Sequence, residues 1–392
     1  MPADLLPPER QPVIIAARRT PVCPVNGALR SLRAHELLAP VLRALVAELA
    51  VDPATVSDVV IGNAVGGGGN VARLALLEAG LPVSVPGITV DRQCGSGLDA
   101  IVLAGRLVAA GGSPLYLAGG VESTSTAPLL AHRTDDGGAD FYQRAQFVPA
   151  SFGDPDMGVA AEIVAQEFGI GRERQDAFAL ASHRKALAAI QDGRFAGEIV
   201  PLATDTGTVS CDGGPRRGLT PAVMRRFPPA FVPGGTVTAG NSCFDADGAS
   251  AVVMTSLEHA RQLGARDALL VRGTATAGVE PRVLGIGAAQ AAGGLLAEAG
   301  VTAEHVDLVE FNEAFASQTL ACLDQLGIDA DRANLDGGAL ALGHAYGASG
   351  AVLVTRLLAQ ARRAGTPGAL GLAMISMAGG MGTAALLEYR RL

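Results

Sequence analysis

The chain has 392 residues, of which 49% are hydrophobic and 17% are charged, and its formal net charge is −8. This length allows one to three domains with a large core, and the acidic balance argues against a nucleic-acid partner. No apolar run reaches the roughly 18 residues that suggest a membrane span, and the N-terminus lacks the basic-then-apolar pattern of a secretory signal. We therefore predict a cytoplasmic protein that partners neither a membrane nor a nucleic acid.

Short apolar strands alternate with helical segments over the first 120 residues. The predicted strands cover residues 13–17, 56–62, 83–90 and 114–120, and the predicted helices cover 34–49, 71–79 and 98–110. Nearly continuous apolar strands separated by helices are typical of an α/β fold whose sheet is covered on both faces. The glycine-rich stretch 63–70 lacks the lysine and the spacing of a phosphate-binding loop, so we interpret it as a plain loop.

Cys94 lies between the predicted strand 83–90 and the predicted helix 98–110. The small residues Gly95, Ser96 and Gly97 let the backbone turn tightly and leave the sulfur open. A thiol at a helix N-terminus feels about half a positive charge, which predicts a lowered pKa and a nucleophilic thiolate. A buried core position is the alternative for any single cysteine, so this assignment depends on the rest of the chain.

Residues from about 124 to 235 are richer in proline, aspartate and arginine and less regular, with helical patterns at 161–168 and 174–191. We interpret this segment as an insertion that caps the core, with regular structure returning over 235–254. The remainder repeats the plan of the first part, with strands at 268–271, 306–311 and 369–376 and a helix at 351–364. In both parts a Ser-Gly pair opens a helix and a later strand runs into a Gly-Gly pair, which suggests a duplication.

The five cysteines are Cys23, Cys94, Cys211, Cys243 and Cys322. They are dispersed, odd in number and without the spacing of metal ligands, which argues against a disulfide framework and predicts no metal site. Because no motif surrounds the first, third and fifth of them, we interpret those three as structural.

Four elements together carry a chemical signal: Cys94, the turn 312–315, His344 and the loop 379–382. A cysteine nucleophile needs a base, which histidine supplies near neutral pH. An acyl intermediate needs donors aimed at its oxyanion, for which backbone N–H groups of a glycine loop and a positioned asparagine are suited. Each signal alone is weak, since a single histidine is more often structural than catalytic.

In this order the elements resemble the thiolase family, and the resemblance runs essentially end to end. The matching segments are Arg19-Thr20-Pro21, Arg92 to Gly97, Gly119 to Ser123, Phe195 with Glu198 to Pro201, Thr236 to Asn241, Asp247 to Ala249, Asn312 to Phe315, and Gly343-His344. The resemblance implies two pseudo-duplicated α-β-α-β-α layered core domains with mixed five-stranded sheets, plus an inserted loop domain. The expected boundaries are 1–120 with 235–265 for the N-terminal core domain, 121–234 for the loop domain and 266–392 for the C-terminal core domain.

The resemblance also implies coenzyme A thioesters as substrates, with no bound cofactor, and it assigns roles. Cys94 would take the acyl group, His344 would activate it and bind the thioester oxygen, and Asn312 would hold a water beside that oxygen. The backbone N–H groups of Cys94 and Ala378 would form a second oxyanion hole, although the family usually has glycine in place of Ala378. The substrate-binding positions would be Cys243, Arg225, Arg226, Phe315, Met157, Gly379 and Gly380.

The clearest departure from the family is Ser376, which replaces a second catalytic cysteine that removes the α-proton of the second acyl-CoA. A free thiol has a pKa of about 8.5, whereas a serine hydroxyl is a far weaker acid, so its alkoxide is scarcely populated at neutral pH. Losing such a base typically costs about 10²–10⁴-fold in rate. Smaller departures are Ala345 for proline, Cys243 for serine, and Pro228 for a basic residue that Arg225 or Arg226 would replace.

Three hypotheses of function stay open. The first is an acyltransferase that forms an acyl-cysteine and passes the acyl group to a second acyl-CoA. The second, prompted by Ser376, is transfer to a decarboxylating nucleophile, an amine, an alcohol or water. The third is a non-catalytic coenzyme A-binding or scaffold subunit. Since thiolases are dimers or tetramers, we expect a homodimer or homotetramer; the tetramer-forming loop would fall within about 126–148, which does not clearly resemble it.

Overall fold

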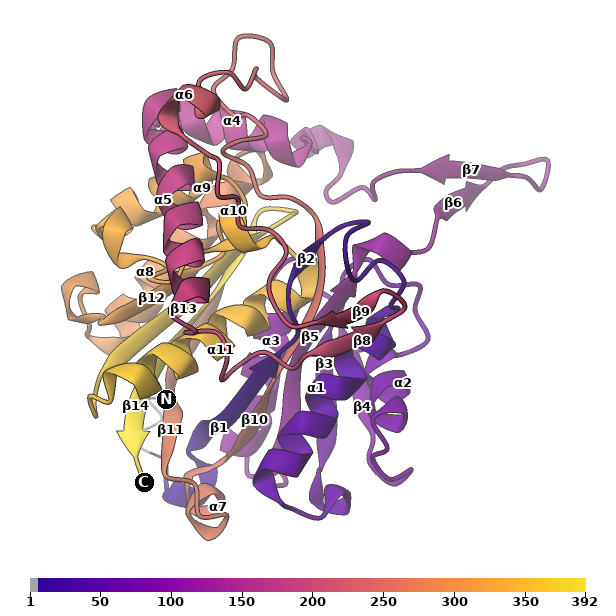
Figure 1. Cartoon of the computed structure of the whole chain (residues 1–392), viewed down its shortest axis with the longest axis vertical. Coiled ribbons are helices and arrows are strands. Elements are labelled where there is room, and N and C mark those ends of the chain that lie inside the picture. The colour runs from indigo at the N-terminus through magenta and orange to yellow at the C-terminus, as the bar shows by residue number, and fades with distance from the viewer. Residues whose placement is uncertain (1–5) are drawn as a thin grey trace.

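The computed structural model describes residues 6–392, so the first five residues of the N-terminal segment used to predict a cytoplasmic protein lie outside it. One mixed sheet runs through the molecule in the order β12-β13-β14-β11-β1-β10-β5-β3-β4 (Figure 1). Its strands are β1 (Pro12–Arg19), β3 (Asp58–Gly62), β4 (Gly87–Val90), β5 (Leu115–Ser123), β10 (Ala246–Ser256), β11 (Asp267–Gly278), β12 (Leu308–Phe311), β13 (Leu370–Met377) and β14 (Met381–Arg391), with β2 (Cys23–Pro24) paired to β10.

The two halves of this sheet follow the same strand order. From the centre of the sheet outward, the N-terminal half has the order β1, β10, β5, β3, β4. Counted along the chain, these are its first, fifth, fourth, second and third strands. In the C-terminal half β11, β14, β13 and β12 repeat this order, and Ala333, in a parallel bridge to Val309, occupies the place of the third strand. The halves join where β1 pairs with β11, with Val13 opposite Leu270. The predicted duplication of plan is thus visible in the topology.

The prediction of five strands in the C-terminal sheet is wrong for the described residues, because a single bridge residue replaces the fifth strand. Asn334 explains why no strand forms there. Its backbone takes a positive φ of 49°, and its side chain bonds both the N–H and the carbonyl of Phe311, at 2.8 and 2.9 Å. These bonds satisfy the edge of β12 without a neighbouring strand.

Helices form three layers around and between the two halves of the sheet. In the outer layers α1 (Ala34–Leu49) and α2 (Val71–Glu78) cover the N-terminal half, and α8 (Gly287–Ala299) covers the C-terminal half with α9 (Ala316–Leu326) packed against it. Between the halves lie α3 (Ser96–Ala109) and α11 (Tyr346–Ala364), which pack on each other and on strands of both halves. One cluster of buried apolar side chains lies under each outer helix layer, and a third surrounds the central helices and meets both halves of the sheet, so the predicted five-layer α/β architecture is confirmed.

Glycines let α3 and α11 begin side by side. A Cβ atom at Gly97 would lie 2.5 Å from the Gly347 carbonyl oxygen, and a Cβ atom at Gly350 would lie 2.5 Å from the Leu98 nitrogen. Any side chain at these positions would push the helices apart, because real Cβ atoms do not approach so closely. The close contact brings together the two loops that precede these helices.

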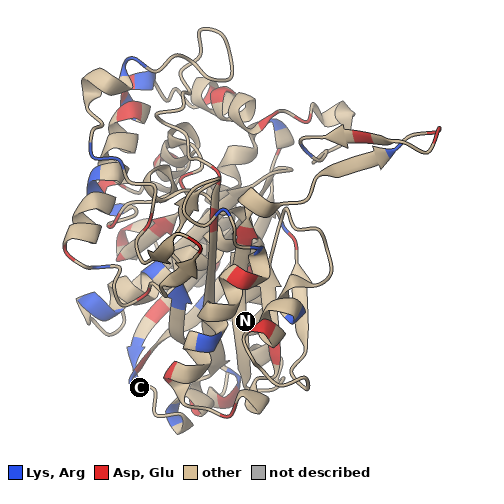
Figure 2. Cartoon of the chain, turned by 45° about the vertical axis from the view of Figure 1, so that its right-hand side comes forward, with Lys and Arg blue, Asp and Glu red and all other residues tan. Residues whose placement is uncertain are grey.

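The segment between β5 and β10 folds as helices and small hairpins that lie at the top and across the middle of the view (Figure 1). Its elements are β6 (Leu130–Arg133), β7 (Ala139–Tyr142), α4 (Met157–Glu167), α5 (Arg172–Gln191), β8 (Leu202–Thr204), β9 (Gly207–Val209) and α6 (Pro221–Met224), while α7 (Leu257–Gln262) and α10 (Ala339–Leu342) lie later in the chain. The β6–β7 hairpin projects away from the body of the molecule (Figure 1). In the view of Figure 2 acidic and basic residues are interspersed over the outer helices and loops.

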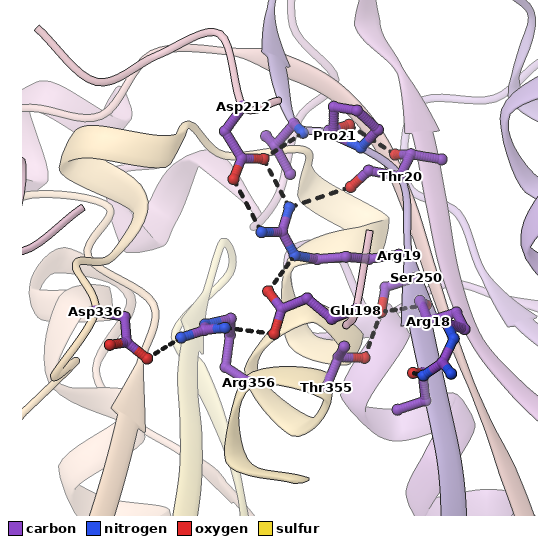
Figure 3. A network of polar contacts seen from close by, with 12 residues as sticks. Arg18, Arg19, Thr20, Pro21, Glu198, Asp212, Ser250, Asp336, Thr355 and Arg356 are labelled. Atoms are coloured by element: carbon purple, nitrogen blue, oxygen red, sulfur yellow. Dashed lines mark hydrogen bonds and ion pairs between the residues drawn. The ribbon is translucent and has the colours of Figure 1, made fainter. Parts of the chain in front are cut away.

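A buried ionic network ties this segment to both halves of the core (Figure 3). Arg19 of β1 donates to Glu198 at 2.7 Å and to Asp212 at 2.6 and 2.9 Å. Arg356 of α11 donates to the other oxygen of Glu198 and to Asp336. The ring of Phe195 lies against both guanidinium groups, with centroid distances of 5.1 and 4.4 Å.

Several element boundaries differ from those predicted. The strand predicted over 83–90 covers only Gly87–Val90, because Pro82 and Pro86 interrupt it and Val85 donates to the Pro82 carbonyl in a turn that leaves Val83 81% exposed. Both central helices begin earlier than predicted, at Ser96 and Tyr346. Within residues 6–392 no helix combines the length and apolarity needed to cross a bilayer.

Candidate active site

Cys94 sits in a turn built by its polar neighbours. Gln93 takes a positive φ of 51°, a conformation that is uncommon for residues other than glycine. Asp91 stabilises it by accepting from the Gln93 N–H at 2.7 Å, and Ser96 Oγ accepts from the Arg92 N–H at 2.8 Å. The tight turn predicted at Gly95 to Gly97 therefore occurs at Gln93. Gly95 serves close packing instead, since a Cβ atom there would lie 2.1 Å from the Met377 sulfur.

His344 occupies in the C-terminal half the place that Cys94 occupies in the N-terminal half, two residues before a central helix. Its N–H donates to the Phe244 carbonyl at 2.9 Å and its carbonyl accepts from Ala246 at 3.2 Å. Its Nδ1 lies 2.7 Å from Ser349 Oγ, while its buried Nε2 has no hydrogen-bond partner among the described residues. Burial lowers the pKa of His344 to about 4, so the imidazole is neutral at physiological pH.

Two backbone N–H groups converge on the Cys94 sulfur. The N–H groups of Ala378 and of Cys94 itself donate to it and lower its pKa, but burial is the larger effect and raises the pKa of Cys94 to about 12. The lowered pKa predicted from the helix N-terminus is therefore wrong, because desolvation of the thiolate outweighs the nearby dipoles. The thiol needs a base in order to act as a nucleophile.

Asn312 supplies a second buried side-chain nitrogen without a partner among the described residues. It follows β12 directly, and its backbone N–H donates to the Met374 carbonyl at 3.2 Å. Its side chain is 2% exposed, and Nδ2 has no hydrogen-bond partner within residues 6–392. An unpaired buried polar atom costs about 1–3 kcal/mol, and such atoms are rare unless they serve a ligand or an ordered water. Asn312 Nδ2 and His344 Nε2 share this property.

The segment 242–246 connects the asparagine turn to the histidine. Cys243 donates its N–H to the Ala314 carbonyl at 2.9 Å, and Ser242 forms a bridge with Phe315. On the other side Asp245 forms a bridge with His344. Burial is the largest cause that raises the pKa of Cys243, followed by the charge of Asp245 and then by a charge on Cys94. The two thiols are therefore close enough for the ionisation of one to affect the other.

Sequence reasoning missed Tyr346, Asp245 and Ser349. The Tyr346 hydroxyl donates to Asp245, and its ring packs edge-on to His344 with centroids 5.1 Å apart. Burial, then the negative charges of Asp245, Cys94 and Cys243, raise the pKa of Tyr346. Ser349 was identified only as part of a helix-opening Ser-Gly pair. Its position five residues after the histidine was the available signal for a contact with Nδ1.

The Ser376 hydroxyl makes its hydrogen bonds with residues other than Cys94. Its Oγ donates to the Gly285 carbonyl at 2.6 Å and accepts from the Ala288 N–H at 3.0 Å. The nearby Ser376 hydroxyl lowers the pKa of the buried Cys322 thiol, although burial raises it overall to about 12, and the Cys322 thiol donates to the same Gly285 carbonyl at 3.3 Å. Both the donor and the acceptor capacity of the serine are thus occupied by the core of the C-terminal half.

The predicted substrate-binding residues fall into two groups. Phe315 meets Phe231 edge-on with ring centroids 5.9 Å apart, and Met157 and Gly379 line one small hollow. Gly379 and Gly380 have φ values of 83° and 80°, which form the turn after Ala378. Arg225 and Arg226, by contrast, are exposed at the end of α6, and no contact among the described residues joins either arginine to Cys94 or His344.

Known proteins match nearly the whole chain. Residues 12–258 match the family model described as the thiolase N-terminal domain, and residues 267–389 match the thiolase C-terminal domain. A Staphylococcus haemolyticus protein named "Putative acetyl-CoA C-acetyltransferase VraB" is 43% identical over 387 residues, covering 97% of this chain and 100% of that protein. Its Staphylococcus aureus counterpart is 40% identical over 380 residues, covering 96% and 98%.

A solved structure agrees with these sequence matches. The crystal structure of the Bacillus anthracis acetyl-CoA acetyltransferase superimposes with a TM-score of 0.89 at 35% identity, covering 97% of this chain and 99% of that one. The two domain matches, the relatives above 30% identity and the shared architecture all agree. The chain therefore belongs to the thiolase family and is an acyltransferase.

Proposed function

We propose that this enzyme takes an acyl group from an acyl-CoA, acetyl-CoA in the first instance, as a thioester on Cys94 and transfers it to a second acyl-CoA. One observation carries the proposal: Cys94 and His344 precede two central helices that touch at Gly97 and Gly347. The names of the relatives, which are acetyltransferases acting on acetyl-CoA, support the choice of donor.

In the first half-reaction the Cys94 proton passes to the neutral His344 Nε2, and the sulfur attacks the thioester carbonyl. The N–H groups of Cys94 and Ala378 stabilise the oxyanion, since both already donate to the sulfur. When the C–S bond to coenzyme A breaks, the departing thiolate takes the proton from His344. In the second half-reaction an Asn312-held water, and His344 once its Nε2 carries a proton again, would bind the oxygen of the second thioester, using the two buried side-chain nitrogens that lack partners among the described residues.

Intact-protein mass spectrometry with acetyl-CoA tests the first half-reaction. We expect one acetyl group per chain, mapped to Cys94 by peptide analysis and absent from Cys94→Ala. A panel of longer acyl-CoAs defines the range of donors. The proposal fails if no acyl-CoA of the panel modifies Cys94 beyond the level seen in Cys94→Ala.

A second candidate function differs in the acceptor. Because the Ser376 hydroxyl is engaged with Gly285 and Ala288, this residue is poorly placed to act as the base for an unactivated acyl-CoA. A decarboxylating malonyl thioester, an amine, an alcohol or water would need no such base. Product analysis of acetylated enzyme mixed with each acceptor distinguishes the two candidates, and condensation with acetyl-CoA favours the first.

We also propose that the enzyme is a homodimer or a homotetramer. Strand β4 lies at the edge of the sheet, and exposed apolar residues lie on it and on α2, including Ile88 at 43% exposed. Unpaired edge strands with exposed apolar side chains favour association. The β6–β7 hairpin lies within the range 126–148 proposed for tetramer formation; it exposes Leu130 and Phe141, and Leu129 just before it is exposed too. We further propose that the N-terminal core domain covers 1–120 with 235–265, the loop domain 121–234 and the C-terminal core domain 266–392.

A further inference from the structure

We propose that Cys243 is the base that removes the α-proton from the second acyl-CoA, the task for which Ser376 is unsuited. This inference rests on the proposed condensation reaction and adds a catalytic residue to it. It starts from the observation that a second free thiol lies on a segment held by both catalytic loops, close enough to Cys94 for a charge on one sulfur to act on the other.

The backbone around Cys243 is fixed on both sides. Its N–H donates to Ala314, two residues after Asn312, at 2.9 Å, and Phe244 accepts from the His344 N–H at 2.9 Å. The bridges Ser242–Phe315 and Asp245–His344 extend this pairing in both directions. Cys243 is therefore held between the two residues whose unpaired side-chain nitrogens would bind the substrate oxygen, and its side chain is half-buried.

The other candidate bases near Cys94 are already engaged. Ser376 is bonded to Gly285 and Ala288. Tyr346 donates its hydroxyl proton to Asp245, and Glu122 accepts from the N–H groups of Ala64 at 2.9 Å and Gly347 at 3.0 Å. The sulfur of Cys243 accepts from its own backbone N–H, and no hydrogen bond within residues 6–392 takes up its proton.

Burial is the main cause that raises the pKa of Cys243, and the charge of Asp245 adds to it. The Cys243 thiol therefore needs a proton acceptor close by, and the pairing of Phe244 and Asp245 with His344 holds the imidazole next to this segment.

The proposed step balances in protons and electron pairs. Cys243 gives its proton to His344 Nε2, and the resulting thiolate takes the α-proton of the second acyl-CoA. The enolate carbon attacks the carbonyl of the Cys94 thioester, the C–S bond breaks, and the Cys94 thiolate takes the proton from His344. The site ends with both thiols protonated and His344 neutral, and no oxidant, reductant or further reactant is needed.

The test compares Cys243→Ser with Cys211→Ser, the same atom exchange at an exposed cysteine. Acetylated enzyme is prepared with acetyl-CoA and chased in D2O with fresh acetyl-CoA. Deuterium entry into the acetyl group and formation of the condensed product are followed by mass spectrometry. We expect Cys243→Ser to slow both by about 10²–10⁴-fold, the usual effect of losing a general base, and Cys211→Ser to match the unaltered enzyme.

A double variant guards against misfolding or simple loss of substrate binding. Adding Ser376→Cys to Cys243→Ser places a thiol at the other position, and recovery of deuterium exchange supports a missing base in Cys243→Ser. Exchange and condensation within about threefold of the unaltered enzyme in Cys243→Ser overturn the inference while leaving the proposed function intact. Failure of the unaltered enzyme to acetylate Cys94 overturns the proposed function instead.

Discussion

The Nδ1 atom of His344 lies 2.7 Å from the Ser349 hydroxyl, in the first turn of the helix that follows the histidine. With its proton on Nδ1 and donated to Ser349, the imidazole keeps a basic lone pair on Nε2, the atom without a partner among the described residues. We predict that His344→Ala slows acetylation of Cys94 by about 10²–10⁴-fold. Ser349→Ala should slow it less, because it frees the ring without removing it. Rapid-quench mass spectrometry measures both rates, and normal acetylation in His344→Ala contradicts the role given to the histidine.

Stability should fall with acid because His344 is buried in its neutral form. Its pKa is about 4 in the folded protein and about 6.5 when exposed. Between pH 6.5 and 4 the His344 side chain is protonated in the unfolded chain but stays neutral in the folded protein. The folded state therefore has its full stability from this group above pH 6.5 and loses it as the pH falls towards 4. His183, whose pKa burial also lowers to about 4, acts in the same sense.

Denaturant unfolding between pH 4 and 7 measures this effect. The His344 contribution is on the order of 3 kcal/mol, so the loss of unfolding free energy with acid should be shallower in His344→Asn. His132→Asn, on the exposed β6–β7 hairpin, serves as the control and should follow the unaltered protein. Equal slopes in all three proteins would show that His344 is not buried as a neutral group.

Arg356 should be far more important to stability than an arginine in an exposed pair. Arg356→Met leaves Glu198 and Asp336 without their shared partner in the buried network, and breaking a buried pair by removing one member typically costs about 3–5 kcal/mol. Arg174→Met removes an exposed pair with Asp324, whose side chains are 47% and 45% exposed, and should cost no more than about 1 kcal/mol. Thermal denaturation measures the loss of stability in each variant. Similar losses in both would contradict the structural importance of the network.

Association through the β4 edge predicts distinct effects of two charge insertions. Ile88→Lys places a charge on β4 and should yield monomers, because it opposes burial of that edge. Phe141→Lys, on the hairpin where the phenylalanine is 65% exposed, should at most reduce a tetramer to a dimer. Light scattering coupled to size-exclusion chromatography measures the masses, and a monomeric unaltered protein would refute both expectations.

Much of the fold and the main candidate site residues were predictable because they depend on local pattern. Apolar periodicity identified most strands and both central helices, and the segments around Cys94, Asn312 and His344 carried the family resemblance. The pattern failed where prolines interrupt an apolar run, as at Val83, and where a side chain satisfies a strand edge, as Asn334 does for β12. Boundaries of helices also shifted, because the first turns of α3 and α11 contain few of the apolar residues that reveal periodicity.

By itself the sequence determined which residues are available for chemistry, and the tertiary structure decided how they act. Burial reverses the pKa change predicted for Cys94, since desolvation depends on how the whole chain packs around the sulfur and outweighs the N–H groups of Ala378 and of Cys94 itself. Close packing of two glycine-bearing helices brings the loops of positions 94 and 344 together across 250 residues, and no local signal encodes that contact. Contacts with Ala314 and His344 hold the segment of Cys243 between the loops of Asn312 and His344, and the Ser376 hydroxyl bonds Gly285 and Ala288, because such contacts between distant segments form only in the folded chain.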